Sequence, residues 1–410
     1  MKSSRRRFRL TALSPVHVGN GEFLVRDVDY LEEEGKTYVI DVERLFELLA
    51  LSPAALDEYS SGRAHLTRLL ERLRVRPERV ASWAYSGRLG VPRVLLLARN
   101  ARGQPLLPGS ALKGALRTLV VWALSFDFDE GARDWVSSRE AAAVMGPAIE
   151  TASDWDSRPG DAVERALLVA PAARRSGAPD HGGDLLRCLG VSDCLVRDTD
   201  LEVSRVQVLT ATPEGPAWKA SERGARARPR PDDPAAASLG VEALRPGATA
   251  TLTLRFDGLY ELLRGEPPPA ERRLFEAARA ELDFEPWRID IPFQVAVHSR
   301  NLGLAVCYRE RRFFEERKLY DLARFYIDLE QKIQKAAGSE AIFARLGWGS
   351  GWEAMTGGIA HDRARERARR RFGLGREGYP FPKSRKLMVE GSKPILPFGW
   401  VRLDPVTTAA

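Results

Sequence analysis

The sequence predicts an α+β fold built from ferredoxin-like (RRM-like) units, with helical insertions and two lobes. Strand-like and helix-like segments are mixed along the 410 residues without the regular alternation of a doubly wound sheet. Polar and apolar residues alternate at 7–12 and 250–256, which predicts two half-buried strands. Apolar residues three and four apart at 312–336 predict one long amphipathic helix.

The remaining elements follow from shorter signals. Further strands are expected at 38–40, 93–98, 288–298 and 395–403. Asp41 is a good N-cap for a helix that runs through Leu49. Two more amphipathic helices fit residues 53–75, so a helical insertion is predicted over about residues 41–90.

Residues 213–240 are the best candidate boundary between domains. They carry five prolines and the run KASERGARARPRP, with almost no large apolar residues. Such a segment predicts a flexible loop or linker. We therefore expect an N-terminal RRM-like domain over 1–212 and a C-terminal α+β domain over 241–410, the latter with a glycine-rich loop and a basic helix.

Charge and composition restrict the partners. The net charge is +7, and the segment from Arg363 to Lys393 alone carries eleven Lys or Arg against three acids. A local basic segment of this kind predicts a polyanionic partner. No apolar run reaches the roughly 18 residues of a membrane span. The three cysteines lack zinc-like spacing, so we expect a cytoplasmic protein without metal or cofactor.

The most informative motif is LLPGSALKGALRTL at residues 106–119. A Pro-Gly turn precedes Ser110, which is a suitable N-cap for the helix that follows. Lys113 and Arg117 are four residues apart, so they project from one side near the helix start. Free N–H groups, the helix dipole and two cations together predict a phosphate-binding site. The alternative is a capped core helix with exposed cations.

This motif resembles the Pro-Gly-Ser-(Ser/Ala)-(Leu/Ile)-(Lys/Arg)-Gly-x-x-Arg signature of the RAMP superfamily, the RNA-binding subunits of CRISPR effector complexes. SPVHVGNG at 14–21 resembles the opening loop of these subunits. Further stretches resemble the RAMP protein that caps one end of the type III-A (Csm) complex. They are YVID at 38–41 followed by Leu45, GWGSGW at 347–352, TGG at 356–358 and LPFGWV at 396–401.

The resemblance implies an elaborated RRM-like RAMP fold and a non-catalytic role in antiviral defence. Such a subunit caps the repeated backbone protein, holds the 3′-side portion of the CRISPR RNA and contributes to guide maturation. The implied partners are CRISPR RNA, the backbone RAMP subunit, the small subunit and recruited nucleases. RNA would be recognised by its backbone and shape, since base pairing is left to the guide.

The candidate RNA-binding residues come from the loops, the Pro-Gly-Ser helix and the basic helix. Glycine-rich backbone can approach a sugar–phosphate chain, tryptophan can stack on bases, and a row of arginines can follow phosphates. The residues are His17, Gly19, Gly21, Gly109, Ser110, Lys113, Gly114, Arg117, Trp348, Gly349, Ser350, Gly351, Trp352, Arg363, Arg367 and Arg370. Arg5–Arg7 and Lys2 form a further basic cluster.

Each candidate has a structural alternative. The tryptophans of 347–352 can anchor a tight turn in the core, His17 can be a loop histidine, and the helix at 363–371 can grip a neighbouring protein. The rival function is an endoribonuclease. His17 as a general base would then cut precursor CRISPR RNA, or Asp27 and Asp29 with a metal would cut target RNA. Alternation at 25–30 favours a strand with a solvated acidic face instead.

Overall fold

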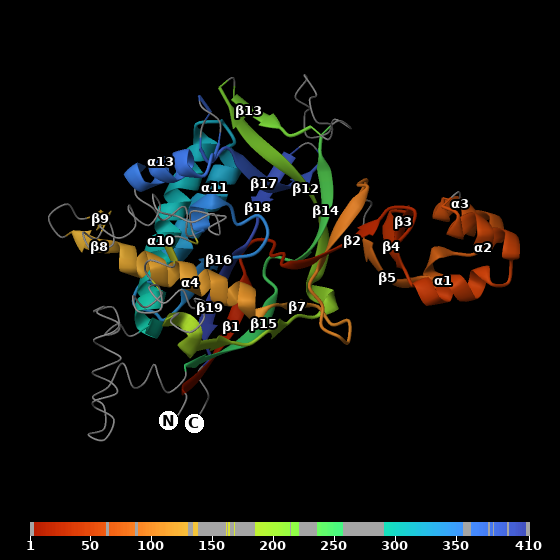
Figure 1. The fold of residues 1–410 in the computed structure, drawn as a ribbon, viewed down its shortest axis with the longest axis horizontal. Helices are drawn as coiled ribbons and strands as arrows, with labels where there is room; N and C mark the ends of the chain where they lie inside the picture. Colours follow the sequence, from red (N-terminus) through yellow and green to blue (C-terminus); the bar gives the residue numbers. More distant parts are fainter. Residues whose placement is uncertain are drawn as a thin grey trace.

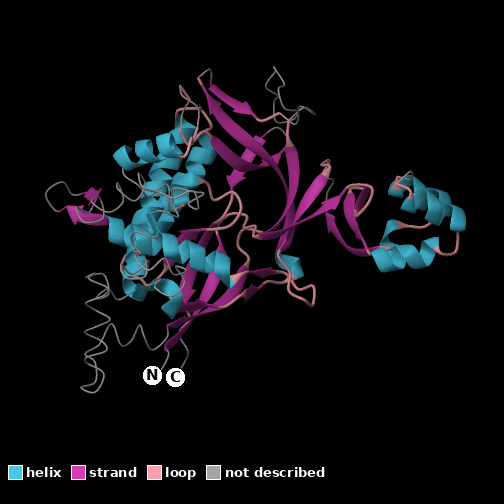
Figure 2. Ribbon diagram, viewed as in Figure 1, coloured by secondary structure: helices cyan, strands magenta, loops and turns pink. Residues whose placement is uncertain are grey.

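The computed structural model consists of a body, in which helices pack beside two sheets, and a smaller lobe that projects from it (Figures 1 and 2). This confirms the predicted α+β class. The structure describes residues 4–62, 65–86, 89–129, 134–137, 161, 163–164, 168, 185–213, 215–220, 236–256, 291–355, 362–375, 378–379, 381–391 and 393–406.

The first sheet has five strands in the order β10-β15-β1-β19-β16, all antiparallel to their neighbours. The predicted alternation in β1 is confirmed: Phe8 and Leu10 are buried in the core, and Arg7 and Arg9 are exposed. The strands are β10 (Leu189–Val191), β15 (Thr249–Phe256), β1 (Ser4–Ala12), β19 (Trp400–Pro405) and β16 (Ile342–Arg345).

The second sheet has seven strands in the order β18-β17-β12-β14-β6-β2, with β13 beside β12. Within it β14 and β6 are parallel, and the other pairs are antiparallel. The strands are β18 (Lys393–Pro397), β17 (Ser384–Glu390), β12 (Leu201–Thr212), β14 (Ser238–Leu244), β6 (Arg93–Leu97), β2 (Gly19–Val25) and β13 (Gly215–Trp218).

Among the described residues, the helices that pack beside these sheets are α4 (Gly109–Ser125), α10 (Ile291–Glu315), α11 (Tyr320–Lys335) and α13 (Asp362–Arg371) (Figure 1). The prediction of a strand at 288–298 is wrong for its described part, which begins α10. Val295, Ala296 and Leu302 are buried at helical spacing, and α10 packs on α4 and β16, so tertiary contacts override the local alternation. None of the described helices combines the length and apolarity needed to cross a membrane.

Two further predictions for the C-terminal half need correction. The helix expected at 312–336 is two helices, because the chain turns at Lys318, whose φ is +57°, between α10 and α11. The strand expected at 395–403 is likewise divided into β18 and β19. Gly399, with φ +96°, makes the break.

Shorter elements also occur among the described residues of the body and the lobe. β7 (Leu106–Leu107) pairs with β11 (Cys194–Leu195), and β8 (Phe126–Asp129) pairs with β9 (Asp134–Ser137). Single 3₁₀ turns are η1 (Pro77–Arg79), η3 (Leu185–Cys188), η4 (Asp198–Asp200) and η6 (Trp352–Ala354).

The projecting lobe contains the predicted helical insertion. A sheet of β3 (Tyr30–Glu33), β4 (Lys36–Ile40) and β5 (Ala81–Ser86) carries α1 (Val42–Leu49), α2 (Pro53–Ser60) and α3 (Leu66–Leu73). The Asp41 carboxylate accepts hydrogen bonds from the backbone N–H groups of Glu43 and Arg44, so the predicted N-cap is confirmed. Leu31, Leu45, Leu49, Leu66 and Leu69 belong to a core that is separate from that of the body.

Strands from both sides of 213–240 share each large sheet. β1 lies between β15 and β19, and β12 pairs with β14 across the predicted linker. Within that linker β13 pairs with β12, while residues 214 and 221–235 lie outside the described residues. The two sheets are therefore not two halves of the sequence, and the division at 213–240 stays a prediction. Pairing between distant strands leaves no local signal that could have shown this sharing.

Candidate nucleic-acid interface

Three segments whose motifs were recognised separately in the sequence meet at one point; the loops around His17 and Trp348 were predicted to bind RNA, and the third segment carries the LPFGWV motif. We call this meeting point the glycine junction, defined by residues 13–19, 345–350 and 398–400. The backbone N–H of Trp348 donates to the His17 carbonyl at 2.8 Å. The Leu346 N–H donates to Gly399 O at 2.9 Å, and the Gly399 N–H donates to Pro15 O at 2.8 Å. Residues more than 300 positions apart are thus joined by main-chain hydrogen bonds.

The glycines of the junction allow the protein to approach its own backbone. At Gly347, with φ +77°, a Cβ atom would lie 2.3 Å from His17 O. At Gly399, with φ +96°, it would lie 2.4 Å from Leu346 O. A side chain fits neither the space nor the dihedral angle. These contacts account for two of the junction's glycines without any ligand.

His17 is a buried, hydrogen-bonded member of the junction, with a side chain only 2% exposed. Its Nδ1 lies 2.6 Å from Glu242 O, to which the Nδ1–H donates. The ring also meets Trp348 edge-on. Burial lowers the pKa of His17 and the charge of Lys386 adds to this, against the hydrogen bond to Glu242, which raises it. The imidazole is therefore neutral at neutral pH, and its Nδ1 is already hydrogen-bonded to Glu242 O.

Glu242 connects the junction to the projecting lobe. Its carboxylate is fully buried and accepts the Tyr85 hydroxyl at 2.5 Å, Arg99 Nη2 at 2.7 Å and the Leu97 N–H at 2.9 Å. Tyr85 belongs to β5 of the lobe, whereas Glu242 belongs to β14 of the body. Burial and the Glu242 charge both raise the pKa of Tyr85. The carboxylate is paired and fully hydrogen-bonded, as a buried charge must be.

Trp348 is half-buried, and a lysine covers one face of its ring. Lys386 of β17 places its Nζ 3.8 Å from the ring centroid, and Phe398 packs edge-on against the indole. Burial lowers the pKa of Lys386, and the nearby charge of Lys219 lowers it further. Sequence reasoning missed Lys386, although it lies within the basic segment 363–393. A base could stack on that face of Trp348 only by displacing the lysine.

The other residues of the glycine-rich loop also contact protein. Ser350 is buried and its hydroxyl donates to Gly347 O at 2.9 Å. Gly349 has φ +89°, and a Cβ atom added there would lie 3.0 Å from the Cβ of Phe398. Gly351 precedes η6, and Trp352 packs edge-on against Phe381. The stretch 356–358 lies outside the described residues.

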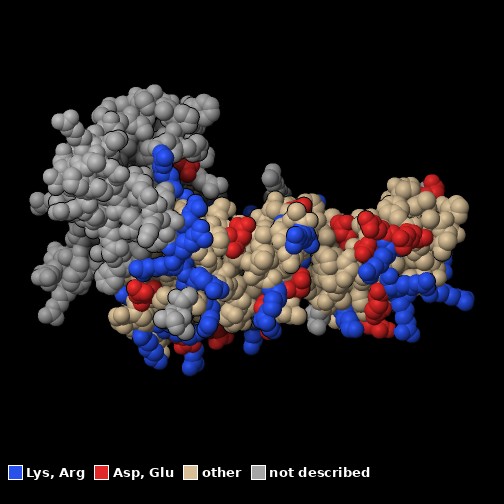
Figure 3. All heavy atoms as spheres, turned by 90° about the horizontal axis from the view of Figure 1, so that it is seen from below, with Lys and Arg blue, Asp and Glu red and all other residues tan. Residues whose placement is uncertain are grey.

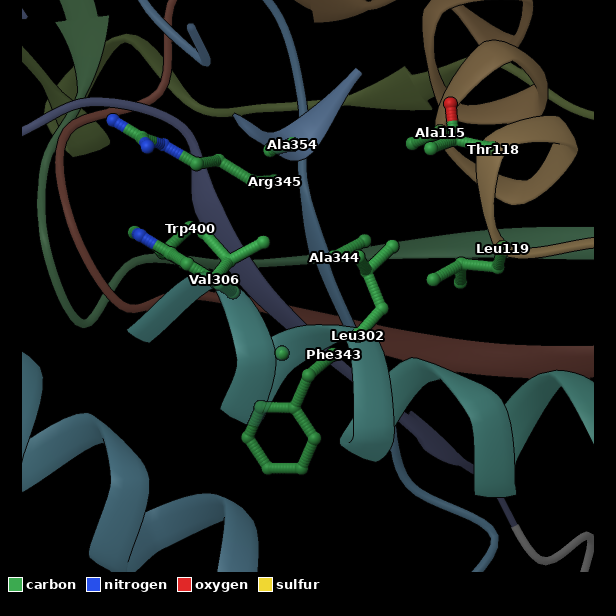
Figure 4. A pocket seen from close by; sticks show the side chains of 11 residues that line it. Ala115, Thr118, Leu119, Leu302, Val306, Phe343, Ala344, Arg345, Ala354 and Trp400 are labelled. Carbon is green, nitrogen blue, oxygen red and sulfur yellow. The ribbon is translucent and has the colours of Figure 1, made fainter. Parts of the chain in front are cut away.

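A small hollow lies behind the junction, between α4, α10 and β16 (Figure 4). Its lining is mainly apolar, and Arg345 and Trp400 direct their nitrogen atoms to the same side. Arg345 Nε donates to Phe398 O at 2.9 Å, and Nη2 donates to Gly349 O at 3.2 Å. The arginine thus holds two segments of the junction together, and the hollow is a packing feature of the core.

The start of α4 differs from the prediction in how it is capped. The helix begins at Gly109, so Ser110 lies inside its first turn and the predicted Ser110 N-cap is wrong. The Gly109 N–H donates instead to Asp193 Oδ1 at 2.7 Å, and a Cβ at Gly109 would lie 2.2 Å from Val191 O. The cap comes from a segment more than 80 residues away, which no local pattern could show. An anionic side chain already occupies this helix end.

The cations of α4 have different surroundings. Lys113 is half-buried, and Gly114 beside it is exposed with open space where a Cβ would be. Arg117 forms an ion pair with Glu164. Within the described part of the chain, Lys113 and Gly114 therefore form the accessible portion of the predicted phosphate site, while Arg117 is held by protein.

The other predicted RNA-binding residues lie at the surface or outside the described residues. Gly19 and Gly21 are exposed at the start of β2, and Gly21 has φ +95°. Arg367 and Arg370 are exposed on α13, whose Ala368 is buried against the core. Arg363 lies in α13, but its side chain is outside the described residues. The basic helix is thus confirmed as a helix, and its RNA contacts stay a prediction.

Asp27 and Asp29 lie in a turn between β2 and β3, not on the strand that alternation at 25–30 predicted. Asp27 has φ +61°, and its carboxylate accepts the Thr67 hydroxyl at 3.0 Å. Asp29 Oδ2 accepts the Val25 N–H at 2.8 Å. Both carboxylates thus stabilise the turn into the lobe. Among the described residues, no group of three or more His, Cys, Asp or Glu side chains is placed to bind a metal ion.

Comparison with known proteins identifies this architecture. A model of the RAMP superfamily matches residues 9–167. A chain in a cryo-EM structure of a Csm–crRNA–target RNA ternary complex of a type III-A CRISPR–Cas system is 24% identical, with a TM-score of 0.63 over 98% of this chain and 100% of that one. The crystal structure of T. onnurineus Csm5 is 23% identical, with a TM-score of 0.61 over 96% of this chain and 99% of the other.

No curated protein matches the chain. The two structural matches nevertheless span nearly the whole length of both partners, so the lobe and both sheets are included in the similarity. The recognition made from the motifs is confirmed to this extent: residues 9–167 match the RAMP superfamily model, and the chain has the fold seen in the Csm5 structure.

Proposed function

We propose that this protein is the CRISPR RNA-binding capping subunit of a type III-A effector complex and that it acts without catalysis. The observation that carries the proposal is the glycine junction, because three motifs recognised separately in the sequence meet there in a chain with the Csm5 fold. The junction stabilises the start of β2, where Gly19 and Gly21 are exposed.

RNA is the ligand that best fits the accessible candidates. Lys113 and Gly114 on α4, Gly21 in β2, and Arg367 and Arg370 on α13 supply cations and open backbone at the surface. Such groups bind phosphates without reading bases. The partners proposed are CRISPR RNA, the backbone RAMP subunit, the small subunit and recruited nucleases, in the cytoplasm.

The environment of the candidate catalytic groups favours a non-catalytic role over an endoribonuclease. A general base must reach the hydroxyl of a substrate. His17 is buried and donates to Glu242 O, and Asp27 and Asp29 accept hydrogen bonds within their turn. Cleavage at any of the three would require the junction or the turn to open.

Purification of the tagged full chain from its host tests the proposal. Mature CRISPR RNA and other Csm subunits should co-purify, and sequencing with mass spectrometry identifies both. A chain that purifies alone and without RNA would overturn the complex-subunit assignment.

Incubation of the purified chain with repeat RNA and with target RNA tests the absence of catalysis. We expect no cleavage with or without magnesium. A metal-independent cut that His17→Ala abolishes would establish the precursor endoribonuclease. A magnesium-dependent cut that Asp27→Ala or Asp29→Ala abolishes would establish the target nuclease.

A further inference from the structure

One face of the five-stranded sheet is exposed along β1 and β15 and carries a row of arginines there. We call it the arginine face, defined by Arg5, Arg7, Arg9, Thr249, Thr251, Thr253 and Arg255. Phe8, Leu10 and Leu252 point into the core, so the residues between them in β1 and β15 point outward. Seen from below, Lys and Arg side chains gather in a band on the underside of the body (Figure 3).

The strand register places one pair of like charges directly opposite each other. Arg5 lies directly opposite Arg255, Arg7 opposite Thr253, and Arg9 opposite Thr251. Like charges at directly opposed positions destabilise a sheet. No ion pair of Arg5, Arg7 or Arg9 occurs within the described residues. An anionic ligand would offset this repulsion.

The acid on the neighbouring strand β19 does not neutralise the row. Asp404 on β19 lies opposite Arg9, but its carboxylate is 2.7 Å from Arg402 Nη2 of its own strand. Arg6 supplies a contrast, because it points to the other side of β1 and pairs with Glu340 at 3.6 Å. Over the part of the chain that the structure describes, the arginines of the exposed face therefore differ from their neighbour in lacking an acidic partner.

The spacing of the row suits a chain of phosphates. Alternate residues of an extended strand are about 6.8 Å apart, so Arg5, Arg7 and Arg9 present three guanidinium groups in a line. Threonine hydroxyls on β15 add donors of the kind that contact phosphate oxygens. None of the residues that define the face is aromatic, so base stacking on a ring is absent there. These features indicate contact with a nucleic-acid backbone that is independent of sequence.

We propose that the arginine face binds the phosphate backbone of single-stranded RNA, as a contact separate from α4 and from the glycine junction. This deepens the proposed function, since it rests on RNA being the ligand. The linear, regular row of cations favours RNA over an acidic protein, whose carboxylates have no comparable regular spacing.

The test measures binding of a fluorescent oligouridylate to the full chain between about 50 and 200 mM salt. Removing one cation that neutralises a phosphate flattens the log–log salt slope by about 0.7 for single strands, so the triple variant Arg5→Gln, Arg7→Gln, Arg9→Gln should flatten it by about 2. Arg6→Gln is the matched control for the single variant Arg7→Gln, because each removes one charge from the same strand but from opposite faces. Its slope should equal that of the wild type.

Each other outcome has a defined meaning. A wild-type chain that binds no oligouridylate at low salt overturns the proposed RNA ligand itself. If the wild type binds RNA and the triple variant keeps the wild-type salt slope, only the proposal that the arginine face binds RNA is overturned. If Arg6→Gln flattens the salt slope as much as Arg7→Gln does, the effect comes from overall charge, and the proposal that the arginine face binds RNA is also overturned. A triple variant that keeps its slope but no longer binds a Csm neighbour shows that the face binds protein.

The melting temperature of the triple variant checks its folding. Arg5→Gln removes the like-charge contact with Arg255, and none of the three arginines has an ion pair within the described residues, so the melting temperature should stay close to that of the wild type. If the triple variant does not fold, Arg7→Gln and Arg255→Gln are each compared with Arg6→Gln, and slopes indistinguishable from the control overturn the inference.

Discussion

The glycine junction and the start of α4 are both built on glycine motifs, but they use glycine differently. In the junction, Gly347 and Gly399 bring the backbone within contact of other segments of the protein. On α4, Gly109 does the same against Val191, whereas Gly114 faces open space beside Lys113. A shared motif thus contains glycines that serve the fold and glycines that leave room for a ligand.

The difference shows that glycine in a binding motif is not by itself evidence of a binding position. The atoms that an added Cβ would meet distinguish the two uses. Where they are backbone atoms of the protein, substitution should affect stability first. Where there are none, substitution should affect ligand binding first.

Loss of the Glu242 carboxylate should destabilise the junction most. In Glu242→Ala the Arg99 guanidinium, whose side chain is only 18% exposed, would remain without its buried partner. Breaking a buried ion pair in this way costs about 3–5 kcal/mol of unfolding free energy, measurable by urea denaturation. Asp198→Ala is the control, because Asp198 pairs with the same arginine at 3.3 Å but is 77% exposed. It should cost less than about 1 kcal/mol. Equal losses of unfolding free energy in the two variants would contradict the view that the buried Glu242–Arg99 pair matters more than the exposed Asp198–Arg99 pair.

A methyl group at Gly347 should cost roughly 3 kcal/mol. Gly347→Ala adds backbone strain at φ +77° and an overlap with His17 O, each worth about 1–3 kcal/mol. Gly338→Ala is matched in φ, at +78°, but has no atom within 4 Å of the added Cβ. It should show the strain alone. Denaturant unfolding of the two variants therefore separates close approach from dihedral strain, and indistinguishable losses would show that the junction tolerates a side chain.

Burial of His17 should make stability depend on pH. Its pKa in the folded state lies below the ordinary value of 6.5, so the unfolded chain binds the proton first as the pH falls. The contribution of neutral, buried His17 to the free energy of unfolding is fully present above about pH 6.5. It is lost below that by up to about 1.4 kcal/mol per pH unit, until the folded pKa is reached. Unfolding in urea between pH 7.5 and 5.5 measures it. His17→Asn should lack this component, and a wild type that is more stable at the lower pH would contradict the sign.

The two cations of α4 should differ in RNA binding. Lys113→Ala should flatten the salt slope by about 0.7, which is about 2.5-fold in affinity between 50 and 200 mM salt. Arg117→Ala should change the slope less, because Arg117 is paired with Glu164. Salt titrations with an unstructured RNA compare the two. A larger change for Arg117→Ala would mean that the ion pair opens to admit RNA.

The sequence by itself determined what depends on short-range periodicity and residue chemistry. It located strand β1, the helix α4, the helices of the lobe with their Asp41 cap, and the motifs that led to the RAMP superfamily. It also located the basic helix α13. Each of these follows from contacts within a few residues, which alternation, helical spacing and capping express directly.

Only the tertiary structure decided which groups the motifs contact. It buried His17 against Glu242, gave the cap of α4 to Asp193 instead of Ser110, and formed α10 where alternation favoured a strand. It also divided the N-terminal arginines between two faces of β1, so that among the described residues Arg6 has an acidic partner while Arg5 and Arg7 have none. These outcomes depend on strand register and on contacts between segments far apart in the chain. A local pattern carries no information about its distant partner.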